Sequence, residues 1–414
     1  MEPRPSTFSI VARDPDTEAV GVAVQSKFVS VGSVVPFASA DAGAIATQSF
    51  ANVAYGPDGL DLLREGKSAE EVVESLTGDD PEAPHMARAR SWVLGQGGAA
   101  RANVFTRIMM AFFRQIPWKG MPCIPVEAVL TPRWFPFHMS KIAYWSRTVL
   151  TPLLILYAKR AKAENPTGRD IRELFVTLPE AETSWQINPT GSRIGDMFLA
   201  LDKVLQRVEP HFPKGARERA IRKAEEFTLS HLNGEDGLGG IYPAMANAVM
   251  ALRVLGYPDD HPAMATARGA IEKLMIERGD DTYYQPCLSP VWDTCLAAQA
   301  ALEAGEREDP RLTKALDWLA SKQILDHVGD WAVRRPGLRP GGWAFQYENP
   351  DYPDVDDTAV VIAAMHRADP ERYAENVARG CEWVVGMQST SGGWGAFDPE
   401  NEHYHLNSIP FADN

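Results

Sequence analysis

The chain has 414 residues, of which 45% are hydrophobic, and it carries a formal net charge of −14. That length allows two or three domains with buried cores, and the acidic balance argues against nucleic acid as a partner. The four cysteines form no Cys-x-x-Cys pair and predict no disulfide framework, which fits a reducing cytoplasm.

The first 80 or so residues predict a small α+β segment. Residues 7–12 and 19–24 read as paired strands around a turn at 14–17. Two helices are expected next, one closing near Gly66 and one opened by the capping box of Ser68 and Glu71. No apolar signal segment opens the chain, and the pattern ends in the Asp/Pro-rich stretch 79–84.

Charge is distributed unevenly along the chain. Residues 1–90 hold seven basic and fourteen acidic side chains, whereas residues 91–170 hold eleven basic and three acidic ones. The longest apolar run, 149–157, is far too short to span a bilayer and reads as a core helix. A basic, apolar segment in an acidic protein suggests contact with anionic lipid headgroups.

From about residue 87 the chain is helical and repetitive. The segment 292–297 recurs at 356–361, the Trp/Gln pattern of 314–323 recurs at 379–388, and the Gly/Trp turn at 329–331 recurs at 393–394, all at offsets of 63 to 65 residues. Gln satisfies backbone groups at helix ends and Trp covers the turns, so we expect structural roles for both. Stacked helical hairpins of this kind close into α/α barrels or toroids.

Three carboxylates lie in four residues at Asp354, Asp356 and Asp357, directly before the apolar stretch 360–365. One interpretation is an ordinary helix start, because Asp and Thr are good N-cap residues and acids complement the helix dipole. The other is an acid site, because carboxylates so close together cannot all ionise cheaply when buried, so at least one pKa should rise. A metal site is not predicted, because no second acidic cluster at ligand spacing is evident.

The aromatic and Gly-rich segments around this run decide between the two interpretations. With residues 289–294, 340–347 and 388–398, the motif Asp354–Ala359 resembles that of the squalene–hopene cyclases over about residues 87–414. The resemblance implies a mainly α fold of α/α barrel (toroid) repeats of the terpene cyclase type, incomplete, with the small α+β segment in front. It divides the chain into an N-terminal fragment at 1–86, a partial membrane-facing barrel at 87–290, and the truncated start of the catalytic barrel at 291–414.

The resemblance also assigns site residues. Asp356 is expected to donate the proton, and Asp354 and Asp357 to shape its surroundings. Five apolar or aromatic side chains are expected to line the substrate cavity or stabilise carbocations: Trp145, Ile241, Trp292, Phe345 and Phe397. Phe397 stands where some members of the family carry Tyr, so a hydroxyl found in those is missing here while the ring face is kept.

The N-terminal segment carries a second resemblance. Residues 7–14 and 54–60 resemble an uncharacterised bacterial family related to the N-terminal-nucleophile hydrolases. If that activity were present, Thr7 would be the nucleophile, which requires removal of the six residues before it. An inert, fused segment is the alternative.

Together these patterns predict a proton-initiated cyclisation of squalene to hopene or hopanol. The resemblance implies no cofactor, no metal, a monotopic attachment to the cytoplasmic side of the inner membrane, and a possible homodimer. Two alternatives remain open at this point: a catalytically silent homologue, because the sequence lacks the barrel half that follows in the family, and a class II diterpene cyclase, which the same acid motif could serve.

Overall fold

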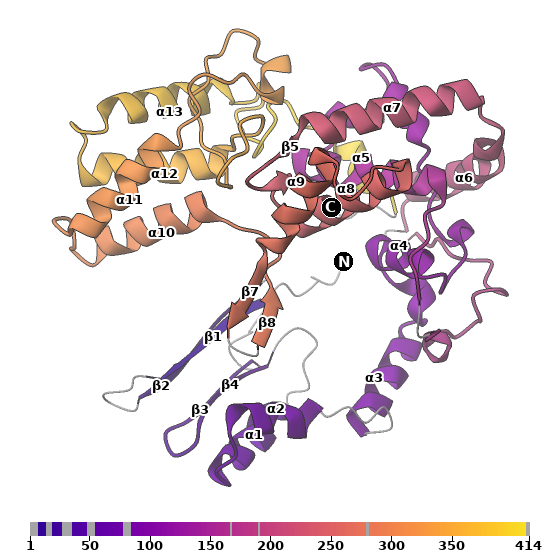
Figure 1. The fold of residues 1–414 in the computed structure, drawn as a ribbon, viewed down its shortest axis with the longest axis horizontal. Coiled ribbons are helices and arrows are strands. Elements are labelled where there is room, and N and C mark those ends of the chain that lie inside the picture. Colours follow the sequence, from indigo (N-terminus) through magenta and orange to yellow (C-terminus); the bar gives the residue numbers. More distant parts are fainter. Residues whose placement is uncertain are drawn as a thin grey trace. The chain divides into compact units, whose positions relative to one another are not determined.

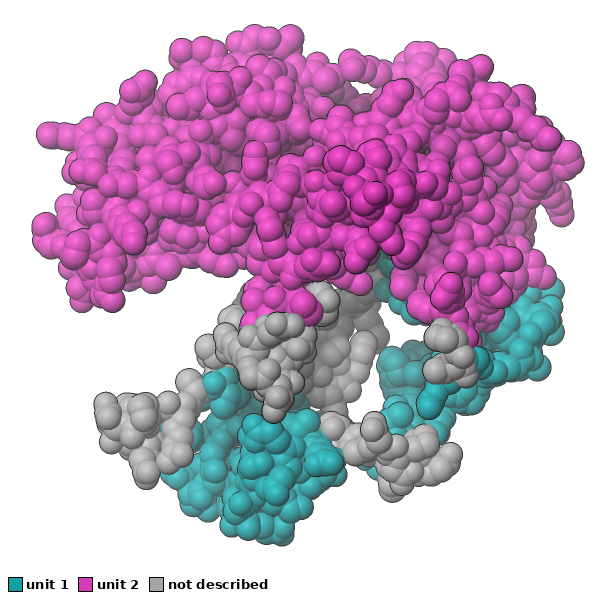
Figure 2. All heavy atoms as spheres, in the orientation of Figure 1, with its two compact units in different colours: residues 1–107, 167–191 teal, residues 108–166, 192–414 magenta. Residues whose placement is uncertain are grey.

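The computed structural model describes residues 7–13, 19–26, 35–47, 54–77, 84–165, 168–188, 191–278 and 281–410. The chain divides into two compact units, coloured separately in Figure 2: residues 1–107 with 167–191, and residues 108–166 with 192–414.

The first unit begins with two antiparallel hairpins and continues with helices (Figure 1). The predicted strand pair is confirmed, with Thr7 opposite Ser26, and the turn predicted at 14–17 lies outside the described residues. The capping box is also confirmed, since Ser68 N donates to Glu71 Oε2 at 2.8 Å and Glu71 N donates to Ser68 Oγ at 3.2 Å. The elements are β1 (Thr7–Arg13), β2 (Val20–Ser26), β3 (Pro36–Ser39), β4 (Gly43–Ala46), α1 (Tyr55–Arg64), α2 (Ala69–Thr77) and α3 (Pro84–Gly95), with α4 (Val104–Phe112) crossing into the second unit.

The second unit is mostly helical, which confirms the predicted fold class. Proline opens several of its helices, where a missing N–H costs nothing, and Gly256 ends α8 in the left-handed region. Its helices are α5 (Tyr144–Lys159), α6 (Arg193–Val208), α7 (Lys214–Ser230), α8 (Tyr242–Leu255), α9 (Pro262–Glu272), α10 (Pro290–Glu303), α11 (Pro310–Ser321), α12 (Val355–Ala368) and α13 (Ala374–Gly386). Two short hairpins interrupt them: β5 (Leu232–Asn233) with β6 (Gly237–Leu238), and β7 (Met275–Arg278) with β8 (Asp281–Tyr284).

Helix pairs build the cores of this unit. In one group α5 packs against α7 and α8, and the apolar run within α5 is buried, as predicted for a core helix. In the other, α10 packs on α11 and α12, and α12 packs on α13 (Figure 1). A buried cluster from α10, α11 and α12 includes Trp343, while Val355 on α12 packs with Trp331, Trp383 and Met387. The start of α12 is therefore enclosed by packed helices and buried tryptophans.

Gln323 and Trp394 of the repeat, and Trp343 of the Gly-rich segment 340–347, bond to backbone carbonyls of these hairpins. Gln323 Nε2 donates to Gly341 O at 2.8 Å and to Asn376 O at 3.0 Å. Trp343 Nε1 donates to Leu319 O at 2.6 Å, and Trp394 Nε1 donates to Val384 O at 2.7 Å. Gln323 and Trp343 thus join the end of α11 to the segment before α12. Gln323 also reaches α13, and Trp394 holds the turn after α13 on that helix.

Candidate active site

The acid motif forms the start of α12. Asp354 is the N-cap residue, and its Oδ1 accepts a hydrogen bond from Asp357 N at 2.7 Å. Its own backbone N–H donates to Trp343 O at 2.9 Å, so Trp343 and Asp354 form a short antiparallel bridge. Thr358 completes the link, because its Oγ1 accepts from Trp343 N at 2.9 Å and donates to Asp354 O at 2.6 Å. The helix start is thus held on the glycine- and Trp-rich segment that the sequence singles out.

Two of the three carboxyl groups are buried. Asp354 and Asp357 are 3% and 2% exposed, and Asp354 Oδ2 and Asp357 Oδ1 accept no hydrogen bond from any described residue. Burial raises the pKa of Asp354 well above its ordinary value, and the charge of Asp357 raises it further. Burial also raises the pKa of Asp357 to about 6, with contributions from the charges of Asp356 and Asp293. The expectation that the motif contains carboxyl groups with raised pKa values is met by this pair.

Asp356 lies between them in sequence but not in its surroundings. It sits in the first turn of α12 and is exposed to solvent. A helix turns by about 100° per residue, so side chains at adjacent positions of one helix point in clearly different directions. The dry surroundings expected for a proton donor at position 356 are therefore not supplied by the described residues.

Trp292 and Phe345 lie on the two segments next to this helix start. Trp292, on α10, is half-buried and packs against the cluster formed with α12. The charge of Asp293, which follows Trp292 on α10, contributes to the raised pKa of Asp357. The start of α10 therefore lies near the acid pair. Phe345 is half-buried and follows Trp343 by two residues. The acid pair and Trp292 therefore belong to one neighbourhood, and Phe345 follows, at two residues' distance along the chain, the Trp343 that bridges to Asp354.

The remaining predicted residues lie on other segments of the same unit. Ile241 is half-buried and forms an isolated bridge with Cys287. Gln346 Nε2 donates to Gly239 O at 3.0 Å, which links the segment of Phe345 to the turn before Ile241. Trp145, on α5, is 42% exposed. Phe397 is half-buried and packs edge-to-face on Tyr144, with ring centroids 5.4 Å apart.

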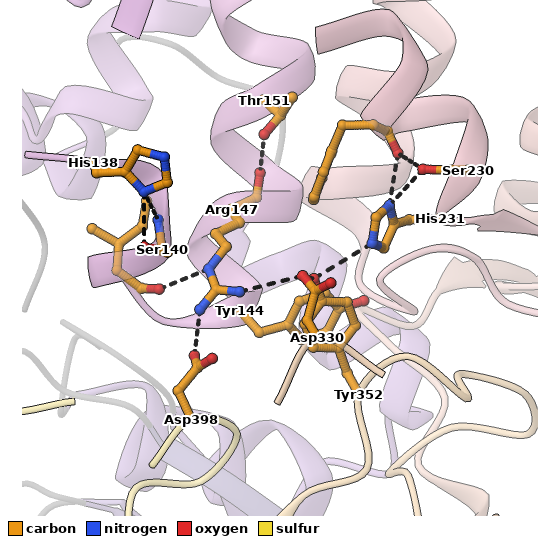
Figure 3. A network of polar contacts seen from close by, with 12 residues as sticks. His138, Ser140, Tyr144, Arg147, Thr151, Ser230, His231, Asp330, Tyr352 and Asp398 are labelled. Carbon is orange, nitrogen blue, oxygen red and sulfur yellow. Dashed lines mark hydrogen bonds and ion pairs between the residues drawn. The ribbon is translucent and has the colours of Figure 1, made fainter. Parts of the chain in front are cut away.

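A polar network around the buried guanidinium of Arg147, near Phe397, was not predicted from the sequence. Arg147, on α5, makes ion pairs with Asp398 at 2.5 Å and with Asp330 at 3.5 Å (Figure 3). Tyr352 donates to Asp330, and its hydroxyl lies 3.5 Å from His231 Nε2. Its members come from segments up to 251 positions apart, and no local motif marks them.

Among the described residues, no group of three or more His, Cys, Asp or Glu side chains could hold a metal ion. No helix of the described chain is long and apolar enough to cross a bilayer. The four cysteines are free thiols, and burial raises the pKa of Cys295 to about 12, so this thiol is a poor nucleophile.

Helical hairpins tied by Gln and Trp side chains around a buried carboxyl pair define a protein of the terpene cyclase type. Comparison with known families specifies it further. Residues 75–280 match the squalene–hopene cyclase N-terminal domain, and residues 288–414 match the squalene–hopene cyclase C-terminal domain. The chain therefore belongs to the squalene–hopene cyclase family, as its acid motif and repeats indicate. Residues 7–100 match a family of unknown function (DUF1028), which confirms the resemblance of the N-terminus to an uncharacterised family.

Individual relatives support the same assignment. The chain is 53% identical over 374 residues to a squalene–hopene cyclase of Zymomonas mobilis, an alignment that covers 87% of this chain and 56% of that protein. It is 48% identical to a squalene–hopene cyclase of Bradyrhizobium diazoefficiens and 43% identical to one of Schizosaccharomyces japonicus, covering 82% of this chain in both cases and 52% and 53% of those proteins. The chain thus spans about half the length of the curated relatives that it matches.

Proposed function

We propose that this chain carries the proton-donating site of a squalene–hopene cyclase, with Asp356 as the donor and Asp354 and Asp357 as the carboxyl groups that shape its acidity. The observation that carries the proposal is the buried pair at the start of α12, whose pKa values burial raises, in a chain that belongs to this family. A helix cap needs only one carboxylate, so capping alone does not explain a second buried carboxyl group three residues later.

The chemistry follows from the substrate. The acid transfers a proton to the terminal alkene of squalene, and the carbocation formed is attacked by the next double bond until the rings are complete. Loss of a proton from a methyl group gives hopene, whereas capture of the last cation by water gives hopanol. The product hopene is an isomer of squalene, so the reaction consumes no oxidant, reductant or cofactor.

Aromatic rings suit such a reaction because their faces attract a cation without offering a lone pair that would trap it. We propose this role for Trp292, Phe345, Trp145 and Phe397, with Ile241 narrowing the path to the site. Each such face contributes on the order of 1–2 kcal/mol when water is excluded.

The proposed domain arrangement follows from the same function. Residues 291–414 would start the catalytic barrel, residues 87–290 would form part of the membrane-facing barrel, and residues 1–86 would be a fused segment. The hydrolase hypothesis for Thr7 stays a prediction, which an intact-mass measurement tests: retention of residues 1–6 excludes an N-terminal nucleophile at this position.

We further propose that the second unit binds a membrane surface as a monotopic protein. Five apolar side chains at helical spacing along α6 are exposed: Ile194, Met197, Leu201, Val204 and Val208. Exposed basic residues on the same helix, such as Arg193, Lys203 and Arg207, suit anionic headgroups. Phe198 of α6 packs edge-to-face on Phe137, close in sequence to Trp134, which is 78% exposed and suited to a lipid interface. Cytoplasmic-side placement and a homodimer belong to this proposal and rest on the family alone.

A second candidate is a catalytically silent member of the family. The exposure of Asp356 favours it, because water competes for a proton from any acid that it reaches. Squalene incubation with gas chromatography separates the two candidates. The native chain and a Glu375→Gln control, altered at an exposed first-turn acid of α13, are expected to give equal amounts of cyclised product, and Asp356→Asn none. Equal product from Asp356→Asn would remove this residue from the mechanism, and no product from the native chain would favour the silent candidate.

A further inference from the structure

Arg147 brings a buried positive charge to the start of α5. Its side chain is only 8% exposed, and its guanidinium bonds to three separate segments of the unit (Figure 3). Nε donates to Ile142 O at 3.0 Å, one terminal nitrogen pairs with Asp398 Oδ2 at 2.5 Å, and the other lies 3.5 Å from Asp330 Oδ2. The planar fork of an arginine holds such partners in a fixed arrangement, which a lysine cannot do.

Each of the two carboxylates is also tied to an aromatic ring that packs on Tyr144. Asp398 directly follows Phe397, whose ring meets Tyr144 edge-to-face at an interplanar angle of 68°. Asp330 accepts a hydrogen bond from Tyr352, whose ring stacks on Tyr144 at an interplanar angle of 14°. Tyr144 itself is 2% exposed and stands three residues before Arg147 on α5. Both the ion pair and the ring contact therefore link α5 to the segment 397–398. On the other side the ion pair reaches Asp330 and the ring contact reaches Tyr352, and these two residues are joined by a hydrogen bond.

We propose that Arg147 is a positioning residue. Through Asp398 it fixes the ring of Phe397 against Tyr144. Through Asp330 it fixes the ring of Tyr352, which stacks on Tyr144. Phe397 has no polar atom in its side chain. Two directional bonds hold its segment: Val355 N donates to Ala396 O at 2.8 Å, and Asp398 forms the ion pair with Arg147.

The use of this arrangement in catalysis rests on the function proposed above. A cation is attracted by the face of a ring only within about 6 Å of its centroid, so a ring that turns or withdraws loses the interaction. Loss of one desolvated face slows the step that it serves by roughly tenfold, the equivalent of about 1.4 kcal/mol. The placement of the ring, in contrast, is a property of the fold and can be tested without any activity.

The ion pair also sets the charge state of Asp398. Burial raises the pKa of this carboxyl, and the facing guanidinium of Arg147 opposes the rise. The other groups that face it are Asp330, which raises the pKa, and Arg334, which lowers it. Without Arg147, the pKa of Asp398 therefore moves further upward, and the carboxyl takes up a proton at a higher pH than in the native chain.

The test is fluorine NMR of the chain with 4-fluorophenylalanine at position 397, followed over pH in four variants. Arg147→Met removes the guanidinium. Arg147→Lys keeps the charge without the fork, and Asp398→Asn keeps the side-chain shape without the negative charge. Arg339→Met removes an exposed pair with Glu382 and is the control.

Arg147→Met is expected to move and broaden the fluorine resonance. The pH at which the resonance senses the titration of Asp398 should also rise. Arg147→Lys should move the resonance without that shift in titration, Asp398→Asn should move it without any titration, and Arg339→Met should match the native chain.

The proposal is overturned if the resonance of both Arg147→Met and Asp398→Asn stays at the native position. If Arg147→Met shows no cooperative thermal transition, Asp398→Asn decides the question alone. Where the native chain cyclises squalene, the variants should also release a larger share of incompletely cyclised products at unchanged KM. If the native chain forms no product, the proposed function fails while the fluorine result still decides the role of Arg147.

Discussion

Replacing Asp357 with Asn should stabilise the second unit at neutral and alkaline pH. Asp357 is 2% exposed, and its pKa of about 6 in the folded chain compares with an ordinary value of 3.8. A carboxyl with a raised pKa binds its proton more tightly in the folded state, so its favourable contribution is complete below pH 3.8 and is lost as pH rises through about 6. A shift of about two pH units corresponds to roughly 3 kcal/mol. Asn at this position carries no charge and avoids that loss.

Urea unfolding followed by tryptophan fluorescence at pH 4, 5, 6, 7 and 8 measures the effect. The quantity of interest is the difference in free energy of unfolding between variant and native chain, because titrating groups that do not interact with Asp357 cancel in it. Asp354 does not cancel: without the charge of Asp357 its pKa is raised less. That difference should rise from near zero at pH 4 to about 3 kcal/mol in favour of the variant at pH 8. A difference that does not change with pH, or a variant that is less stable at pH 8, would refute the assignment of a buried carboxyl with a raised pKa at position 357.

Three further results are expected. Thr358→Val leaves the buried backbone N–H of Trp343 without its acceptor and should lower the free energy of unfolding by about 1–3 kcal/mol. The control Thr313→Val, at an exposed position of α11, should change it little, and thermal melts of the two variants make the comparison. Gln323→Leu removes the donor to Gly341 O and Asn376 O and should cost a similar amount, detected as faster amide exchange at the ends of α11 and α13; native exchange rates there would contradict it. Leu201→Asp on α6 should weaken co-sedimentation with phosphatidylserine vesicles by roughly tenfold or more. The control Leu325→Asp, at a 49% exposed position outside α6, should not weaken it. Equal binding of the two variants would contradict the proposal that α6 binds the membrane.

The repeats were predictable because their signals are local. The pattern 292–297 recurs at 356–361, and the corresponding helices α10 and α12 begin at Pro290 and Val355. Helix starts depend on caps and prolines that can be read from a few residues, as Asp354 illustrates. The hairpin of β7 and β8 was not predicted, because the stretch 275–284 carries several charged residues and no clear alternation of apolar and polar positions.

The site was predictable in its residue types and less so in its surroundings. The sequence places three acids in four positions, but helix geometry turns them apart, so Asp354 and Asp357 are buried while Asp356 is exposed. The network around Arg147 could not be predicted, since Arg147 and Asp398 are 251 positions apart and meet only through tertiary packing. An arginine inside an otherwise apolar helix was the one available signal, and a solvated arginine would have looked the same in the sequence.

Isotope labelling tests the central claim most directly. Squalene is incubated with the chain in D₂O, where every exchangeable carboxyl proton is replaced by deuterium, and the extracted product is examined by gas chromatography with mass spectrometry. Proton-initiated cyclisation adds one hydrogen from the acid and releases one from the substrate. The account predicts hopene in which one deuterium replaces one hydrogen of the squalene composition. Asp356→Asn should give no such product. Cyclised product without deuterium, or the same labelled product from Asp356→Asn, would contradict the claim that this carboxyl group starts the reaction.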